Sequence, residues 1–457
     1  MKKCHFTKCI SLLFLSISIV LLIYAYYRSE IFYHGLKGNQ YFKYYLISLS
    51  GIFFWGFVLR LKEKLRANIV LLTISLIVGL YFIEVLLNSV IISQLTPDRI
   101  KIASDLGIRF DQRSKLEVLE DLNDNGIEAV PTITPFSLLK RRSRELDNDK
   151  LFTFGGVSNI ETVGSNEGGQ YSRYKSDRYG FNNPDSEWDA KQTQWLLTGD
   201  SFTQGVAVQP GEDIASRIRE FTKESVINLG NSGNGPLIEL AALREYAVHL
   251  QPKKVLWLYF ERNDLVGELQ GEKKNPLLLK YIKDDFSQNL INRQNEVDLK
   301  LRELILKEKS SKLKEKSNKS QRIRSILDIT RILRLTGVRN ALNFDSKKVV
   351  LEPLFLTILS KAKTRVEAWG GALYFVYLPE YSRYSKDVIH NNYRKKSKVL
   401  DAVTELNIPV IDIHNKVFYK HSDYTSLFPL GLVGHYNAEG YKEVAKAIID
   451  EVQKYEE

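Results

Sequence analysis

The sequence predicts a three-layer α/β fold, in which a parallel sheet lies between two layers of helices. A helical membrane anchor precedes this fold in the chain. Short apolar segments alternate with helical segments from Gln192 onward, which is typical of a parallel sheet covered on both faces. Three long apolar runs open the chain, and a charged insertion at about 265–344 interrupts the alternation. The expected strands are Trp195–Thr198, Ser225–Leu229, Lys254–Phe260, Ala372–Leu378 and Ile408–Ile411.

Helices are expected between these strands. One of them carries a proline in its first turn, where the missing N–H costs nothing. The expected helices are Gly211–Phe221, Pro236–Leu250, Leu351–Trp369, Lys395–Leu406 and a last helix from about Ala438.

The apolar runs near the N-terminus predict a membrane anchor of three transmembrane helices over residues 1–95. Each run is close to the roughly 20 residues that a spanning helix needs, and a cleaved signal peptide would explain only the first. Lysines precede the first run, and four basic residues lie between the second and third, so both segments should face the cytoplasm. Everything after about residue 95 is then expected on the extracytoplasmic side. The runs are Ile10–Tyr27, Tyr44–Leu59 and Ile69–Ile92.

Two features outside the sheet leave alternatives open. Glu84 lies within the third run, where a carboxylate either marks a functional site or reaches outward to the membrane surface. The insertion has a lysine-rich centre at Lys307–Lys319 and is expected to form charged helices or a partly disordered excursion. It is either a solvated face or a lid or membrane-facing element, since anionic lipid attracts such a segment.

Residues 98–190 are predicted to form a smaller accessory region between the anchor and a catalytic domain at 191–457. Asp111 is expected to cap a helix that runs to about Asp124, where Asn125-Gly126 stops it. Glycine pairs later in this region indicate turns and short strands. None of them forms a phosphate-binding loop, because no Gly-Lys-Ser/Thr follows.

The net charge of +11 does not indicate a nucleic-acid-binding protein. Residues 1–100 contribute +7 and residues 291–340 contribute +8, which leaves the remainder at −4. A basic face for nucleic acid is therefore not expected on the catalytic body. Both cysteines, Cys4 and Cys9, precede the first apolar run, so no disulfide can brace the rest of the chain.

Four short blocks follow the expected strands and supply the parts of an acyl-transfer site. Ser201 comes directly after the first strand, at the carboxyl end where open α/β sheets place their sites. Gly233 lets a backbone N–H approach a developing oxyanion, and the amide of Asn263 could donate to the same oxygen. The blocks are Gly199-Asp200-Ser201, Gly230-Asn231-Ser232-Gly233, Arg262-Asn263-Asp264 and Gly434-His435-Tyr436-Asn437.

The base that activates Ser201 is assigned to His435 by position. The sequence has no histidine between His34 and His249, and His249 lies at the end of an expected helix, away from the strand ends. His435 lies in a loop after the last strand and just before Asn437, a cap for the final helix. A histidine in that loop can take the proton of the serine hydroxyl.

Together the four blocks resemble the SGNH (GDSL-like) hydrolase superfamily over about Gln192–Tyr455, the insertion excluded. The resemblance implies an SGNH/flavodoxin-like sheet, with Ser201 as nucleophile, His435 as base, and Gly233 and Asn263 in the oxyanion hole. Two positions depart from the family pattern. Glu261 stands where the family often has glycine, and Leu432 stands where it usually has the aspartate that orients the histidine. Asp412 is a possible supporting acid, and a Ser–His dyad is the alternative.

Three further stretches also resemble membrane-anchored SGNH proteins associated with bacterial surface polysaccharides: Gly155–Asn159, Asn166-Glu167 and Ser176–Pro184. That resemblance implies a bacterial cytoplasmic membrane protein acting on a carbohydrate ester, with acetyl as the acyl group. The reaction is either ester hydrolysis or transfer to a sugar hydroxyl, and a membrane-bound acyl donor protein as partner would favour transfer. Tyr381 and Tyr384 are candidates for sugar contact or for ordinary packing. No cofactor and no metal are expected, because the histidines are scattered without ligand spacing.

Two other functions remain open from the sequence. The first is a non-catalytic glycan-binding or scaffold protein of a polysaccharide export system, which Leu432 favours and the intact Ser201, Asn263 and His435 oppose. The second is a lipase acting on the membrane that anchors it, which would place an apolar groove beside the serine.

Overall fold

In a computed structural model, the chain is described over residues 2–32, 38–95, 99–140, 151–283, 286–315, 332–341, 351–384 and 395–457. It divides into two compact units. The first contains residues 1–96 together with 321–346, and the second contains residues 97–320 and 347–457. The end of the predicted insertion therefore groups with the N-terminal helices, which the sequence pattern did not indicate.

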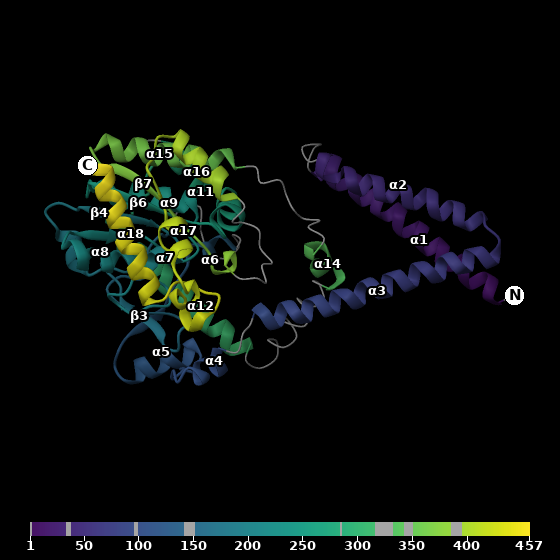
Figure 1. The fold of residues 1–457 in the computed structure, drawn as a ribbon, viewed down its shortest axis with the longest axis horizontal. Helices are drawn as coiled ribbons and strands as arrows, with labels where there is room; N and C mark the ends of the chain where they lie inside the picture. Colours follow the sequence, from purple (N-terminus) through teal and green to yellow (C-terminus); the bar gives the residue numbers. More distant parts are fainter. Residues whose placement is uncertain are drawn as a thin grey trace. The chain divides into compact units, whose positions relative to one another are not determined.

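The second unit is built on a five-stranded parallel sheet with strand order β5-β4-β6-β7-β8 (Figure 1). This confirms the predicted fold class. After β4 the chain forms β5 on one side of it and then β6 on the other side. The strand order therefore reverses between β4 and β6, and open α/β sheets place their sites at such a point. The strands are β4 (Trp195–Gly199), β5 (Val226–Asn228), β6 (Lys254–Phe260), β7 (Ala372–Leu378) and β8 (Val410–Asp412).

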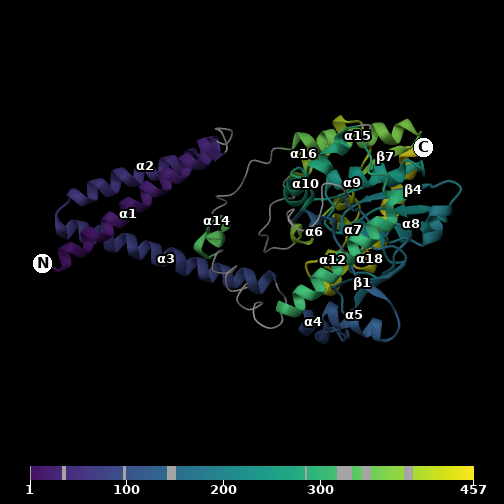
Figure 2. The ribbon, with the colours of Figure 1, turned by 180° about the vertical axis from the view of Figure 1, so that it is seen from behind.

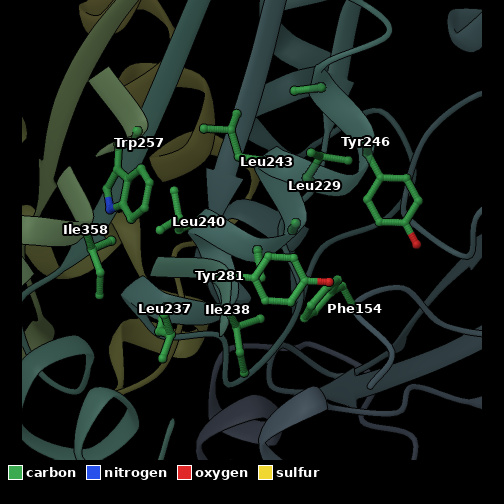
Figure 3. Packing of buried hydrophobic residues seen from close by; sticks show 14 of the residues in the cluster. Phe154, Leu229, Leu237, Ile238, Leu240, Leu243, Tyr246, Trp257, Tyr281 and Ile358 are labelled. Atoms are coloured by element: carbon green, nitrogen blue, oxygen red, sulfur yellow. The ribbon is translucent and has the colours of Figure 1, made fainter. Parts of the chain in front are cut away.

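Alternate side chains of the strands enter two separate hydrophobic cores. Trp257 on β6 packs with Leu240 and Ile358 in one core (Figure 3). Its neighbours Leu256 and Leu258 point the other way and belong to the second core. Because both faces are buried, the central strands are apolar throughout, which is why their bounds follow from the sequence.

Helices cover both faces of the sheet. The first core is covered by α9 (Pro236–Ala242), α15 (Pro353–Ala368) and α16 (Lys396–Glu405), and the last two lie side by side in both views (Figure 2). The second core is covered by α8 (Ile214–Thr222) and α18 (Ala438–Glu456), which contact each other. A π-helical turn at Leu243–Ala247 extends α9.

The accessory region contains a smaller three-stranded sheet. Its order is β1-β2-β3, with β1 parallel to β2 and β3 antiparallel to it. The strands are β1 (Ala129–Pro131), β2 (Glu161–Asn166) and β3 (Tyr171–Lys175), and the helices are α4 (Arg99–Asp105), α5 (Lys115–Asp124) and α6 (Pro135–Lys140).

The expectation that Asp111 caps the helix ending at Asp124 was wrong. Ser114 is the cap of α5: its hydroxyl accepts the N–H of Glu117, and the Glu117 carboxylate accepts the N–H of Ser114. This reciprocal box satisfies two N–H groups at once. Asp111 instead forms an ion pair with Arg113 at 2.7 Å.

The segment before β4 ties the accessory region to the edge of the main sheet. The buried carboxylate of Asp177 accepts hydrogen bonds from Phe181 N–H, Trp188 Nε1 and Asn183 Nδ2. Asn183 also exchanges two hydrogen bonds with the backbone of Asn228, so its side-chain amide pairs with β5 as a neighbouring strand would. The edge of the sheet is thereby covered.

The first part of the predicted insertion belongs to the folded domain. Tyr281, Leu290 and Leu301 are buried in the first core, and Asp298 binds Ser158 of the accessory region through its hydroxyl at 2.6 Å. The expected charged helix is present as α12, but its inner face is apolar. The lysine-rich centre is described only as far as Glu315. The helices here are α10 (Leu269–Glu272), α11 (Pro276–Leu279) and α12 (Gln294–Glu315).

The first unit contains three helices long and apolar enough to cross a membrane. Their large apolar side chains are mostly exposed, which suits a lipid surround. The helices are α1 (Lys2–Tyr26), α2 (Gly38–Arg60) and α3 (Glu63–Leu95), and the candidate spans are Phe6–Phe32, Tyr41–Arg60 and Glu63–Leu87.

Glu84 on α3 is buried against a short helix from the insertion, α14 (Thr336–Ala341). Its two carboxylate oxygens accept the N–H groups of Gly337 and Val338, each at 2.8 Å. These N–H groups are in the first turn of α14, where no intrahelical acceptor exists. The carboxylate therefore caps a helix of its own unit.

Candidate active site

Ser201 lies at the carboxyl end of β4, as the sequence predicts. It is the first residue of α7 (Ser201–Gln204), and Asp200 caps this short helix by accepting the N–H of Phe202 at 2.9 Å. The turn fixes the serine at the reversal of strand order, with its side chain half-buried. Its hydroxyl has two neighbours, Asp200 Oδ2 at 3.4 Å and His435 Nε2 at 2.8 Å.

His435 reaches Ser201 from the loop before α18. The side chain of Asn437 caps α18 through Gly440 N–H, which holds the loop in place. The imidazole packs against the ring of Phe202, with 4.7 Å between the ring centroids. The structure thus brings together the two residues that the sequence assigned as nucleophile and base.

The carboxylate beside the imidazole is Glu167, just after β2 in the accessory region. Its Oε1 lies 2.7 Å from His435 Nδ1, and its Oε2 accepts the backbone N–H of His435 at 2.8 Å. Arg99 donates to the carbonyl oxygens of Glu167 and Val433 and so joins the two loops. Ser201, His435 and Glu167 form a continuous hydrogen-bonded chain.

The approach of Glu167 depends on glycine at position 434. A Cβ atom built on Gly434 would lie 2.4 Å from Glu167 Oε2, which is closer than real Cβ atoms come. Any side chain here would displace the carboxylate from the histidine loop.

Asp412, the acid proposed from the sequence, serves a different purpose. Its carboxylate accepts the N–H of Asn415 as the cap of α17 (Ile413–Lys416) and pairs with Lys396 at 2.6 Å. The correction has a physical reason: the first turn of α17 needs an acceptor for its N–H groups, and Asp412 directly precedes it.

Sequence reasoning noted Asn166-Glu167 only within the resemblance to membrane-anchored proteins and gave Glu167 no role at the site. It lies 268 positions from His435 in the chain, in a region predicted to be accessory. Leu432, at the position where the family has its acid, is in extended conformation. Two residues in the sequence indicated that the acid comes from elsewhere. Leu432 replaces the usual acid, and Gly434, directly before the histidine, leaves room for another carboxylate.

The charges around the imidazole stabilise its protonated form. Burial alone would lower the pKa of His435, but the charge and hydrogen bond of Glu167, together with the charge of Asp200, raise it above its ordinary value. Burial alone would raise the pKa of Glu167, but the interactions with His435 and the charge of Arg99 bring it below its ordinary value. An ionised Glu167 therefore favours proton uptake at His435.

Gly233 lies in the loop after β5, in the left-handed conformation with φ of 77°. Within the described ranges, no hydrogen bond uses its N–H. Gln204 fixes this loop, because its Oε1 accepts both the N–H and the hydroxyl of Ser232 while its Nε2 donates to Tyr174. Gln204 is a positioning residue that the sequence did not single out.

Asn263 follows β6, across the point where the strand order reverses. Its side-chain amide donates to Glu268 Oε1 at 2.7 Å, and its Oδ1 is buried without a partner. The amide is also near Asp200, the residue before the nucleophile. Its role as an oxyanion donor stays a prediction.

The other two expectations concern Glu261 and the tyrosines. Glu261 is buried and pairs with Arg383, while also accepting Tyr377 Oη–H, so it links the ends of β6 and β7. Tyr384 Oη lies 2.7 Å from His414 Nδ1, and Tyr381 donates to a backbone carbonyl. Both tyrosines pack against the second core, which favours the packing interpretation.

The chain is similar in structure to GDSL-type lipolytic proteins. One is a putative lipolytic protein from Desulfitobacterium hafniense, with 12% sequence identity and a TM-score of 0.32 over 57% of this chain and 99% of that one. A lipase/acylhydrolase from Enterococcus faecalis shares 13% identity, with a TM-score of 0.31 over 58% and 97% of the two chains.

A third similar structure is a catalytic mutant of an acetylxylan esterase from Geobacillus stearothermophilus, with 14% identity and a TM-score of 0.30 over 57% and 94%. No protein-family model and no curated protein matches the chain. The function proposed below therefore rests on the geometry of Ser201, His435 and Glu167.

Proposed function

We propose that the protein is a serine-dependent esterase or O-acyltransferase. The observation that carries this proposal is the hydrogen-bonded chain from Ser201 Oγ through His435 to Glu167. A hydroxyl, an imidazole and a carboxylate in this order activate the oxygen for attack on a carbonyl carbon.

The reaction proceeds through an acyl-enzyme. Ser201 Oγ attacks the ester carbonyl while His435 Nε2 takes the hydroxyl proton, and ionised Glu167 stabilises the imidazolium. The Gly233 N–H offers a hydrogen bond to the oxyanion of the tetrahedral intermediate. His435 then returns the proton to the leaving alcohol, and the C–O bond to that alcohol breaks. The acyl group leaves Ser201 when water or a second alcohol attacks, again with His435 as base.

An acetylated polysaccharide is the substrate we propose. The support is the sequence resemblance of residues 155–184 to membrane-anchored proteins associated with bacterial surface polysaccharides. Water as acceptor makes the protein an esterase, and a sugar hydroxyl makes it a transferase that takes acetyl from a membrane-bound donor. Release of acetate from an acetylated oligosaccharide, compared with appearance of acetyl on an unmodified one, separates the two.

Hydrolysis of p-nitrophenyl acetate by the full-length protein in detergent tests the serine site. We expect Ser201→Ala and His435→Ala each to lower kcat/KM at least about 10³-fold, because both residues act in bond formation. Matched controls are Ser360→Ala and His249→Ala, two exposed positions, which should keep full activity. A fluorophosphonate should label the unmodified protein and not the Ser201→Ala variant.

Absence of both hydrolysis and labelling in the unmodified protein would favour a binding or scaffold function instead. That alternative had its support in Leu432, and Glu167 now supplies the carboxylate that Leu432 does not. A strong preference for long-chain over acetyl esters would favour a lipase acting on the membrane.

A further inference from the structure

A group of buried carboxylates lies directly behind the nucleophile. One carboxylate oxygen from each of Asp200, Asp264 and Glu268 comes within 4.8 Å of the other two, and all three residues are buried. They come from three places in the chain: the cap of α7, and the two ends of the π-helical turn Asp264–Glu268 after β6. Within the described ranges, no lysine, arginine or histidine forms an ion pair with any of them.

Each of these carboxylates accepts a hydrogen bond on one oxygen, and the second oxygen of Asp200 lies 3.4 Å from Ser201 Oγ. Asp200 Oδ1 accepts Phe202 N–H, Asp264 Oδ2 accepts Phe260 N–H, and Glu268 Oε1 accepts the Asn263 amide. Asp264 Oδ1 and Glu268 Oε2 are buried without any partner.

A fourth carboxylate points to a ligand independently of those three. Glu239 on α9 is fully buried, and both of its oxygens are without a hydrogen-bond partner. Its helix α9 contacts the turn Asp264–Glu268, and Gly235, one turn before Glu239, lies against the Glu268 side chain. A buried carboxylate with no donor is costly to the folded state. A positive ion among these oxygens would remove that cost.

We propose that Asp200, Asp264, Glu268 and Glu239 bind a divalent cation, for which calcium fits best. Calcium takes six to eight oxygen ligands at about 2.3–2.6 Å, so ligand oxygens on opposite sides of the ion are separated by about 5 Å. Magnesium, at about 2.0–2.1 Å, brings opposite ligands to about 4.2 Å. A site made of several protein carboxylates suits calcium, because magnesium usually keeps several of its own waters and binds through one or two carboxylates. Sequence reasoning expected no metal, because it considered histidine spacing and these ligands are carboxylates from separate elements.

The ion acts on the loop that carries Ser201. It holds Asp200, which caps the helix that begins with Ser201, and Glu268, which binds the Asn263 amide. Both loops that border the reversal of strand order are thus fixed to one point.

Calcium binding to the full-length protein in detergent tests the proposal. After treatment with EDTA and removal of the chelator, equilibrium dialysis with metal analysis should show one calcium ion per chain. Calcium should also raise the unfolding temperature of the metal-free protein, because a ligand that binds only the folded state stabilises it. Parallel dialysis against magnesium and manganese measures the preference.

Two variants identify the ligands, with Glu439→Gln on the surface of α18 as the matched control. Glu239→Gln and Glu268→Gln should lose calcium binding, while the control should bind one ion. No hydrogen bond depends on the Glu239 carboxylate, so its variant should fold. Without metal, Glu239→Gln should be at least as stable as the unmodified protein, since it removes a buried like charge. With calcium, only the unmodified protein and the control should gain stability.

Two results would overturn the proposal. The first is an unmodified protein that binds none of the three cations and unfolds at the same temperature with and without them, which would mean that the carboxylates share protons instead. The second is calcium binding by both variants that equals binding by the control.

Discussion

The histidine loop shows how single residues complete the site. Glu167 contacts both the ring nitrogen and the backbone N–H of His435, so one carboxylate sets the orientation of the ring and the position of its main chain. Gly434 makes the approach possible because it has no Cβ atom. The acid of the proposed triad thus comes from the accessory region, which makes that region part of the proposed active site.

Replacement of Glu167 by glutamine tests this role through pH. The variant should lose roughly 10³- to 10⁴-fold in kcat, because an amide does not stabilise the imidazolium. Catalysis needs neutral His435, so activity rises as pH increases through the pKa of the histidine. Glu167 raises that pKa, and its removal should shift the acid limb of the kcat/KM profile to lower pH. An unshifted limb would mean that Glu167 has only a structural role. Glu167→Asp keeps the charge, so its acid limb should lie between those of the unmodified protein and of Glu167→Gln.

Gly434→Ala tests the close approach without changing any charge. The added methyl group should displace Glu167 from His435 and lower kcat/KM by about 10²-fold, since small displacements of catalytic groups have effects of that size. Gly168→Ala is the matched control next to Glu167, because its Cβ would meet only Pro429 at an ordinary 3.7 Å. Equal activity of the two variants on p-nitrophenyl acetate would contradict the prediction.

Position in the fold made some site residues predictable and hid others. Ser201, Gly233 and Asn263 each follow a strand of the main sheet, so the strand pattern alone placed them at one edge. His435 followed from elimination and from the cap at Asn437. Glu167 follows a strand of a separate sheet, and the sequence contains no pattern for the packing of the two sheets. The buried carboxylates follow or cover the main sheet, but a sequence pattern does not show that a carboxylate is buried without a hydrogen-bond donor.

At the scale of elements, burial decides how much the sequence shows. The strands β6 and β7 were predicted with their observed bounds, since both of their faces are buried and every residue is selected to be apolar. The accessory strand β2 carries glycine, serine and asparagine within Glu161–Asn166, so it has no comparable pattern. The helix α12 was seen only as charged, because its lysines outnumber the few positions that face the core.

Asp412 is expected to affect the stability of the helix α17 and not catalysis. Asp412→Ala removes the cap of α17 and the ion pair with Lys396. We expect the free energy of unfolding to fall by about 1 kcal/mol, as for other lost caps, with kcat/KM unchanged. Urea denaturation and the ester assay check the two halves. A large loss of activity at unchanged stability would return Asp412 to the catalytic site.

At the scale of the whole molecule, the chain returns to its N-terminal helices between β6 and β7, before the second unit is complete. The insertion separates β6 from β7, and its last part groups with residues 1–96. Basic residues before the first span and between the second and third favour a cytoplasmic N-terminus. On that basis, which remains a proposal, α3 ends on the extracytoplasmic side, and the catalytic domain lies there too.

A disulfide between α14 and α3 tests whether the end of the insertion packs against the N-terminal helices of the same unit. A Cβ atom built on Gly337 would lie 3.0 Å from the Cβ of Leu87, near the spacing of roughly 3.5–4.5 Å that a disulfide requires. With Cys4 and Cys9 replaced by serine, Leu87→Cys with Gly337→Cys should form a disulfide on oxidation. The sign is a faster-migrating band on non-reducing electrophoresis that a reductant removes.

A matched pair within the same unit, Leu71→Cys on α3 with Gly337→Cys, should not cross-link, because Leu71 is exposed and lies roughly 24 Å along the helix from Leu87. Glu84→Ala should weaken the first cross-link, because it removes the acceptor for Gly337 and Val338 N–H. These two N–H groups would otherwise be unsatisfied in an apolar surround, so the carboxylate is what makes docking of α14 favourable there. Equal cross-linking with and without Glu84 would show that apolar packing alone holds the insertion to the anchor.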